Sequence, residues 1–233
     1  MTKLYIDLKK NLHFTTRESY LSVYRCHIKD SWFGEMYIKD VTKTDVILFY
    51  NEITEDLTNS FLENVHRIIH GCFDLALENH WIRFNPTQNV MRLYPANVPE
   101  RQPYTKEQEN LLLNFVKNDG TYYIYYPLII CFLETMLRAS EMFGLTWSNI
   151  DFINNTITVD HQVLYTRYEG KYQFIASKVK TKAGNRVIPL TQRAKKAFLY
   201  QRKQQISLNR QPTIQVGSYS DFVFTTRSGR PYT

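Results

Sequence analysis

Residues 133–151 read LETMLRASEMFGLTWSNID, and this stretch decides how the rest of the chain is interpreted. It follows an almost unbroken apolar run, residues 127–133, which is typical of a helix buried on all sides. The run then stops, and a single arginine, Arg138, precedes a short helix predicted over residues 139–144. Glu141 lies in the first turn of that helix, where an acid complements the helix dipole. Arg138 is therefore expected at the end of a rigid, buried element.

The pair formed by Arg138 and Glu141 has two interpretations. A guanidinium beside a dry core needs a carboxylate or phosphate partner. Glu141 follows three residues later on the same helical face and can orient the guanidinium. The pair is either structural, capping a buried helix, or it prepares Arg138 for an anionic ligand. Spacing alone favours the structural interpretation.

Two segments resemble the tyrosine recombinases, also called the phage integrase family. Residues 135–151 are similar to the family's first arginine box, TGLRxSE followed by LxWxDID, except that Met136 stands where the family usually has glycine. Residues 180–190, KTKAGNRVIPL, are similar to the family's KTxxSxRxIPL hairpin, and the two segments occur in the family's order. Because glycine relaxes a tight turn, the turn at Met136 is expected to be strained or differently packed.

The resemblance implies roles for particular residues. In this family two arginines clamp a DNA phosphate, a hairpin lysine protonates the leaving 5′ oxygen, and a tyrosine attacks to form a 3′-phosphotyrosine. Carried over to this chain, Arg138 is the first clamp, Glu141 its orienting acid and Lys180 the lysine. Lys182 is the alternative lysine, because hairpin length varies in the family. The covalent link retains the bond energy, so we expect no nucleotide cofactor and no metal.

Other cations are candidates for accessory contacts to DNA phosphates. They are Lys178, Lys182, Arg186, Arg92 and Arg101. Lys178, Lys180 and Lys182 alternate along the predicted hairpin, so they point to one side of it. A solvated lysine row on an edge strand is the competing interpretation. For Arg92 and Arg101, a solvated linker is the better interpretation of each arginine alone.

Charge favours an anionic partner. Lys and Arg exceed Asp and Glu by 29 to 22, which gives a net charge of +7. The resemblance specifies that partner as double-stranded DNA at particular recombination sites, on which the chain is expected to assemble with other recombinase protomers. A third interpretation is an unrelated helical protein in which the Arg–Glu pair and the lysine hairpin are structural.

Cysteines and apolar runs bear on the compartment. Cys26, Cys72 and Cys131 fall singly within apolar helical patterns, which predicts reduced core residues. The first residues do not read as a signal peptide, and the longest apolar runs are far too short to span a bilayer. We therefore expect a cytoplasmic protein with no membrane partner.

The predicted fold is mainly α-helical with a small antiparallel β-sheet. Residues 1–90 are predicted to form a helical bundle of about four helices after a loose lead or a first half-turn, similar to the family's SAM-like core-binding domain. Residues 91–103 contain three prolines and are predicted to be a linker. Residues 104–233 are predicted to form an incomplete α+β catalytic domain. Its predicted strands are residues 156–159, 172–175 and 186–190.

Two histidine patterns in the bundle are not interpreted as sites. His66 and His70 share a helical face, but no third metal ligand is evident, so a core or surface pair is expected. His80 and Arg83 spell HxxR, which resembles the family's second arginine box. In the family that box follows the lysine hairpin, whereas this one precedes it, so no catalytic role is expected.

The remaining catalytic groups of the family belong to the region after residues 228–231. Tyr232 comes too early to be the nucleophile. The resemblance therefore implies a site-specific recombinase or integrase of which these residues are a fragment, expected to bind DNA but not to complete cleavage. The alternative is a non-catalytic DNA-binding regulator derived from the same fold.

Overall fold

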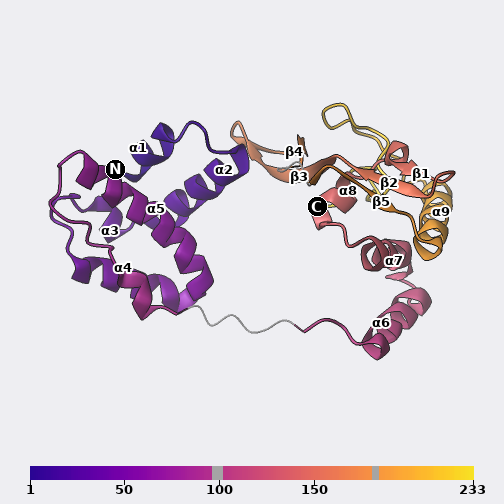
Figure 1. Ribbon diagram of the computed structural model, residues 1–233, viewed down its shortest axis with the longest axis horizontal. Coiled ribbons are helices and arrows are strands. Elements are labelled where there is room, and N and C mark those ends of the chain that lie inside the picture. Colours follow the sequence, from indigo (N-terminus) through magenta and orange to yellow (C-terminus); the bar gives the residue numbers. More distant parts are fainter. Residues whose placement is uncertain (96–101, 180–183) are drawn as a thin grey trace. The chain divides into compact units, whose positions relative to one another are not determined.

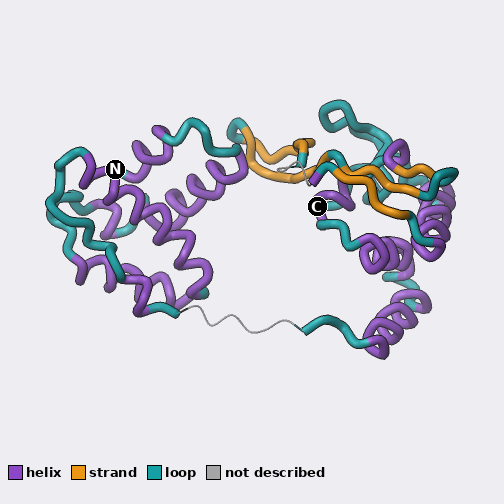
Figure 2. The backbone as a smooth tube through the Cα atoms, in the orientation of Figure 1, coloured by secondary structure: helices purple, strands orange, loops and turns teal. Residues whose placement is uncertain are grey.

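The chain forms two compact units, Met1–Arg101 and Gln102–Thr233. The computed structural model describes residues 1–95, 102–179 and 184–233 (Figure 1). Helices dominate both units, and in the described residues all strands lie in the second unit (Figure 2). The predicted fold class, mainly α with a small antiparallel β component, is confirmed.

The first unit is a bundle of helices around one apolar core. Its elements are α1 (Thr2–Leu8), α2 (Phe14–Val23), the π-helix η1 (Tyr24–Ile28), α3 (Trp32–Glu35), α4 (Lys43–Asp56), α5 (Asn59–Glu78) and the 3-10 helix η2 (Val90–Leu93). Helix α5 has the widest buried face, which runs from Leu62 to Ala76, because its apolar residues recur at helical spacing. Phe49 and Tyr50 of α4 are buried in the same core.

Capping explains which helix starts are recognisable in the sequence. Thr42 and Asp45 form a reciprocal capping box at the start of α4, and Thr58 caps α5. A threonine before an acid is also present at Thr15, but it does not cap a helix. Helix α2 begins at Phe14, and the Thr15 hydroxyl hydrogen-bonds to the ring of His13, at 2.9 Å.

The N-terminal segment and the first residues of the predicted linker pack into the bundle, which their sequences do not indicate. Instead of a loose lead, α1 buries Ile6 and Tyr5 in the bundle core. Gly71 of α5 lies beneath it, and a Cβ there would meet the Tyr5 hydroxyl at 2.0 Å. At the other end of the unit, Tyr94 donates a hydrogen bond of 3.1 Å to the carbonyl of Ile47. The bundle therefore includes the beginning of the segment predicted as linker.

The second unit combines helices with two small sheets. Its helices are α6 (Lys106–Asn118), η3 (Tyr123–Tyr125), α7 (Tyr126–Thr135), α8 (Ala139–Gly144), η4 (Trp147–Asn149) and α9 (Gln192–Ser207), and its strands are β1 (Ile150–Asp151), β2 (Thr156–Val159), β3 (His161–Tyr168), β4 (Lys171–Lys178) and β5 (Arg186–Pro189). The predicted buried helix is α7, which packs against α9 in the core of the unit.

The strands differ from the prediction in number and pairing. The three predicted strands correspond to β2, β4 and β5, but they do not form one sheet. One antiparallel sheet has the order β1-β2-β5, and β3 and β4 form a separate ribbon. Glu169 and Gly170 both have positive φ, at 50° and 84°, and close this ribbon as a tight turn. Lys178, which precedes the predicted lysine hairpin, and Arg186, which lies within it, therefore belong to different sheets.

The turn after α7 confirms the expectation of strain at Met136. This residue has φ 51° and ψ 29°, the left-handed conformation that favours glycine. Its backbone N–H bonds to the carbonyl of Phe132 at 3.0 Å, and its side chain is 78% exposed. The chain therefore leaves α7 at a backbone conformation that costs free energy for any residue with a Cβ.

We expect Met136→Gly to raise the stability of the second unit by about 0.5–1 kcal/mol. The left-handed conformation costs an L-residue roughly 1–2 kcal/mol, and the greater chain entropy of glycine offsets part of that gain. Thermal unfolding would measure the change. Met136→Ala is the matched control, since it also removes the exposed side chain but retains the Cβ. A glycine variant no more stable than the alanine variant would contradict this account.

Candidate functional site

A buried carboxylate organises the region around Arg138. The Glu141 side chain is 2% exposed, and both of its oxygens accept hydrogen bonds from two arginines. Arg138 donates its backbone N–H and Nη1, each at 3.0 Å. Arg186 donates Nη1 at 3.2 Å and Nη2 at 2.9 Å, which makes a two-pronged pair. Residues 138 and 186, distant in sequence, therefore meet at one carboxylate.

The two arginines differ in exposure. The Arg138 side chain is 75% exposed, and that of Arg186 is 29% exposed. The expectation that the Arg138 guanidinium lies beside a dry core is therefore wrong, because the carboxylate is the buried member of the pair. Arg138 is the N-cap residue of α8, and its extended backbone directs its side chain outward while Leu137 is buried. The site thus presents one exposed guanidinium, that of Arg138, bonded to the buried carboxylate of Glu141.

The charges of this cluster stabilise each other. Burial alone disfavours the charged form of Glu141, but hydrogen bonds from Arg186 and then from Arg138 outweigh it and hold the carboxyl pKa below its usual value. The bond to Glu141 in turn raises the pKa of Arg186. Glu141 is therefore ionised at neutral pH, and it fixes the orientation of both guanidinium groups.

Arg186 was expected as an accessory phosphate contact, but in the structure its guanidinium bonds to Glu141. Its guanidinium faces Glu141 and also donates to the carbonyl of Gly184 at 3.0 Å. The sequence carries a signal for this arrangement. Along β5, Arg186 alternates with Val187 and shares the less exposed side with Ile188. A cation on the inward side of a strand requires an acidic partner, and Glu141 is that partner.

The structure places the other candidates apart or does not describe them. Lys178 is exposed at the end of β4, and Arg92 is exposed on η2 of the first unit. Lys180, Lys182 and Arg101 lie outside the described residues. Within the described part of the chain, the cluster that forms is Arg138, Glu141 and Arg186.

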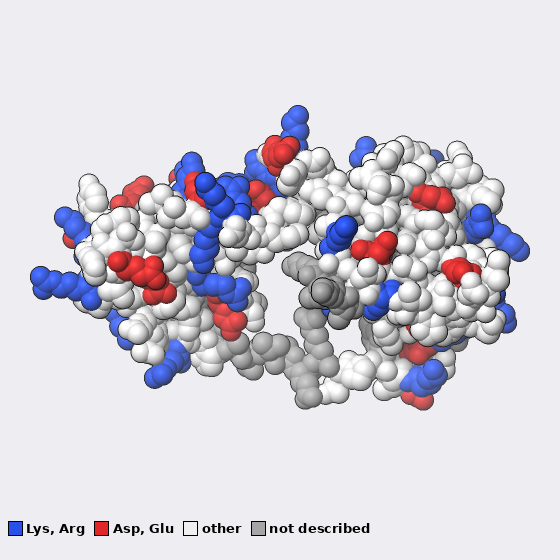
Figure 3. All heavy atoms as spheres, turned by 45° about the horizontal axis from the view of Figure 1, so that its top comes forward, with Lys and Arg blue, Asp and Glu red and all other residues white. Residues whose placement is uncertain are grey.

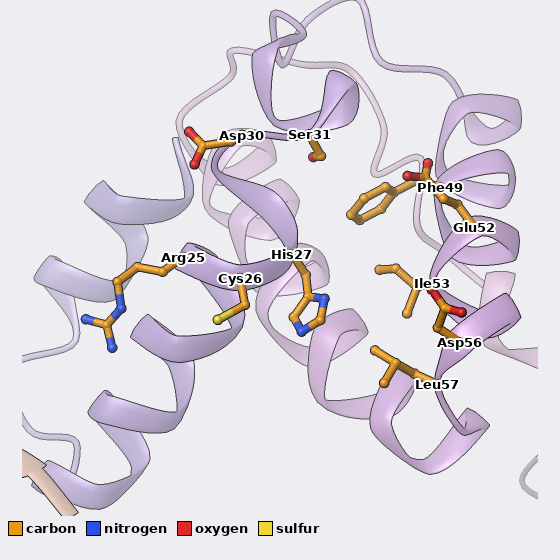
Figure 4. A pocket seen from close by; sticks show the side chains of 10 residues that line it. All are labelled: Arg25, Cys26, His27, Asp30, Ser31, Phe49, Glu52, Ile53, Asp56 and Leu57. Carbon is orange, nitrogen blue, oxygen red and sulfur yellow. The ribbon is translucent and has the colours of Figure 1, made fainter.

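A pocket of about 400 Å³ lies in the first unit between η1 and α4 (Figure 4). Asp30, Glu52 and Asp56 line it, and Glu52 accepts a hydrogen bond of 2.7 Å from the Trp32 indole. Arg25 and His27 also line the pocket, but three carboxylates outnumber the single arginine and oppose the binding of a phosphate. This pocket is therefore not a candidate for an anion site.

The paired histidines of α5 have protein partners. His66 Nδ1 lies 2.8 Å from the Tyr50 hydroxyl, and His70 Nδ1 lies 2.6 Å from the Thr87 hydroxyl. His70 also approaches Asp74, with Nε2 3.3 Å from the carboxylate. Over residues 1–95, 102–179 and 184–233, no group of three or more His, Cys, Asp or Glu side chains is arranged to hold a metal ion.

The expectations about cysteine burial and membrane spans can also be compared with the structure. Cys72 and Cys131 are buried as predicted, whereas Cys26 in η1 is exposed, contrary to the expectation of a core residue. Across the part of the chain that the structure describes, we find no helix with the length and apolar character needed to cross a bilayer.

Comparison with known proteins places this geometry in context. Residues 103–233 match the model of the phage integrase family. The transposase from transposon Tn916 of Enterococcus faecalis is 34% identical over 174 residues, which are 73% of this chain and 41% of that protein. The ICEBs1 integrase of Bacillus subtilis is 27% identical over 169 residues, 72% of this chain and 44% of that protein. The chain thus spans less than half the length of these curated relatives.

Solved structures give the same relationship. The Tn1549 transposon integrase in complex with a circular intermediate DNA superposes with a TM-score of 0.87 and 26% identity, over 100% of this chain and 73% of that one. A lambda integrase dimer bound to a COC′ core site shares the fold, with a TM-score of 0.60 and 12% identity over 99% of this chain and 71% of the other.

We expect the two arginines of the cluster to differ sharply in their effect on stability. Arg186→Met leaves a buried carboxylate without its two-pronged partner and is expected to cost about 2–4 kcal/mol. Arg138→Met removes an exposed partner and is expected to cost less than about 1 kcal/mol. Urea unfolding followed by circular dichroism would measure both. Equal losses for the two variants would show that Arg186 does not support Glu141 as described.

We also expect a pH-dependent contribution from His66. Burial, and then the neighbouring His70, lowers the pKa of His66 to about 4 from 6.5. Between about pH 6.5 and pH 4, His66 is therefore protonated in the unfolded chain but not in the folded chain. The free energy of unfolding falls as the pH decreases through this range, by about 1–2 kcal/mol when partial exposure is allowed for. Urea unfolding at pH 7 and pH 4.5 would measure the loss. His66→Gln should lose less over this interval, and an unchanged pH dependence would contradict the assignment.

Proposed function

The chain belongs to the phage integrase family, the tyrosine recombinases, and from that premise we propose that it contributes to site-specific cutting and rejoining of DNA through a 3′-phosphotyrosine link. The observation that carries the proposal is an exposed guanidinium, Arg138, held by a buried and ionised Glu141. Because the chain spans less than half of its curated relatives, the complete reaction is proposed for the whole protein.

Arg138 is suited to clamp a phosphate. Among the described residues its guanidinium bonds to Glu141 alone, through Nη1, so its Nε and Nη2 donors are available to a ligand. A planar fork of donors matches two oxygens of a phosphate. A fixed cation beside the phosphate stabilises the charge that develops when the phosphodiester is attacked. Glu141 thereby acts as the orienting acid and Arg138 as the clamp.

We propose Lys180 as the acid that protonates the leaving 5′ oxygen, with Lys182 as the alternative. Both follow Lys178, the last residue of β4, and the resemblance of residues 180–190 to the lysine hairpin supports the assignment. Lys178 and Arg92 are proposed as accessory phosphate contacts because both are exposed. Arg101 is retained as a weaker candidate, and Arg186 acts first by supporting Glu141.

Double-stranded DNA is the proposed partner, and the two units differ in the net charge with which they would attract it. In Gln102–Thr233, Lys and Arg number 17 and Asp and Glu nine, so the net charge is +8. In Met1–Arg101 the counts are 12 and 13, a net charge of −1. Figure 3 shows Lys and Arg on the surfaces of both units, interspersed with Asp and Glu. The second unit therefore supplies the net attraction toward DNA phosphates.

The relatives support two further parts of the proposal. The Tn1549 integrase was solved in complex with circular intermediate DNA, and we propose that this chain likewise acts on DNA ends of a mobile element. Recombination joins two duplexes, so we propose that several copies assemble on the DNA. A protein with this role acts where the DNA is, which in a bacterial host is the cytoplasm.

Salt-dependent DNA binding provides the test. We expect Arg138→Ala to weaken binding to a duplex about tenfold and to reduce the slope of log affinity against log salt by about one phosphate contact. Arg138→Lys should preserve the slope but recover only part of the affinity, because an ammonium lacks the planar fork. Fluorescence anisotropy over a salt series would measure both quantities. In a protein that spans the full length of the relatives, Arg138→Ala should abolish covalent capture of DNA.

The matched control is Lys117→Ala, which removes an exposed cation from the last turn of α6. It should change affinity less than Arg138→Ala does. Full affinity and full covalent capture in the Arg138→Ala protein would reject the recombinase assignment of this site.

A further inference from the structure

His161 is buried, yet both nitrogens of its ring face oxygen atoms. It is the first residue of β3 and is 3% exposed. Nδ1 lies 2.6 Å from Oδ1 of Asp160, and Nε2 lies 2.7 Å from the carbonyl oxygen of Gly144. The ring therefore bridges two oxygen atoms from different parts of the unit, the residue before β3 and the last residue of α8.

Neighbouring side chains hold the ring of His161 in place. The ring of Tyr219 stacks on the imidazole with centroids 3.5 Å apart and planes within 9°. Asp160 also accepts a hydrogen bond of 3.3 Å from Asn149, so the carboxylate that His161 contacts is itself fixed. Lys178, which is exposed, is the pairing partner of His161 in β4.

The carbonyl that His161 holds closes helix α8. The last carbonyls of a helix lack partners within it, and the ring of His161 supplies a partner for one of them. Gly144 lies directly against β3, since a Cβ at this position would be 2.8 Å from the backbone nitrogen of Val163. A second tie joins Ser140 to Gln162 of β3, at 3.0 Å between the side-chain oxygens. Helix α8 is therefore docked on β3 at both of its ends.

The same short helix carries Arg138 at its other end. An α-helix of six residues is about 9 Å long, so fixing the carbonyl of Gly144 restricts the position of Arg138. The ribbon adds a second connection, because Lys178, opposite His161, is followed by the segment that contains Lys180. His161 thus lies where the arginine helix meets the strand that leads to the lysines.

We propose that His161 is a positioning residue whose buried ring, held between Asp160 and the carbonyl of Gly144, clamps α8 to β3 and so holds Arg138 in the orientation that contacts a DNA phosphate. This inference rests on the proposed function of Arg138. It assigns His161 no contact with DNA and no step in the reaction.

A double-mutant cycle tests the coupling between His161 and Arg138. We expect His161→Gln to weaken duplex binding at neutral pH by about as much as Arg138→Ala, roughly tenfold, because the glutamine cannot bridge both oxygens. In the Arg138→Ala background, His161→Gln should change affinity by less than about twofold. His66→Gln is the matched control, the same change at a half-buried histidine of the first unit, and its effect should be the same in both backgrounds.

The outcomes separate this inference from the proposed function. If Arg138→Ala weakens binding but His161→Gln weakens it equally in both backgrounds, His161 acts through general stability and the positioning role is overturned. If Arg138→Ala leaves binding unchanged, the proposed function of Arg138 fails, and the positioning role fails with it.

Discussion

The structure of the second unit depends on one buried carboxylate. Removing the charge of Glu141 from water is unfavourable, and hydrogen bonds from two arginines that are distant from each other in sequence offset this free energy. Because both arginines must be present, the start of α8 and the start of β5 are brought to the same place. The exposed guanidinium of Arg138 is a result of this arrangement, since Glu141 holds it from the protein side and leaves its outer edge to solvent.

Local signals in the sequence predicted much of the fold. The unbroken apolar run before Arg138 identified α7, because such a run is recognisable within a few residues of one sequence. The strain at Met136 was expected for a different reason, since the family that the segment resembles usually has glycine at this position, and the backbone of Met136 is left-handed.

Contacts between distant segments were not predictable. The partner of Glu141 on β5 lies 45 residues away, and the pairing of β4 with β3 rather than with β5 depends on the whole unit. The exposure of Arg138 was not predicted correctly either. The apolar run before it indicated buried surroundings, but the turn at Met136 directs the chain away from the core. Helix α1 lacks a side-chain cap and carries few inward residues, so its burial depends on α5.

The unequal charge of the two units has a kinetic consequence. For a protein that binds DNA in the manner proposed, the second unit, at +8, is retained near any duplex by release of counterions more strongly than the first, at −1. One unit can then keep the chain on DNA during sliding while the other engages only where its surface fits. Rapid scanning and slow commitment to a target would thereby be assigned to different parts of the same polypeptide.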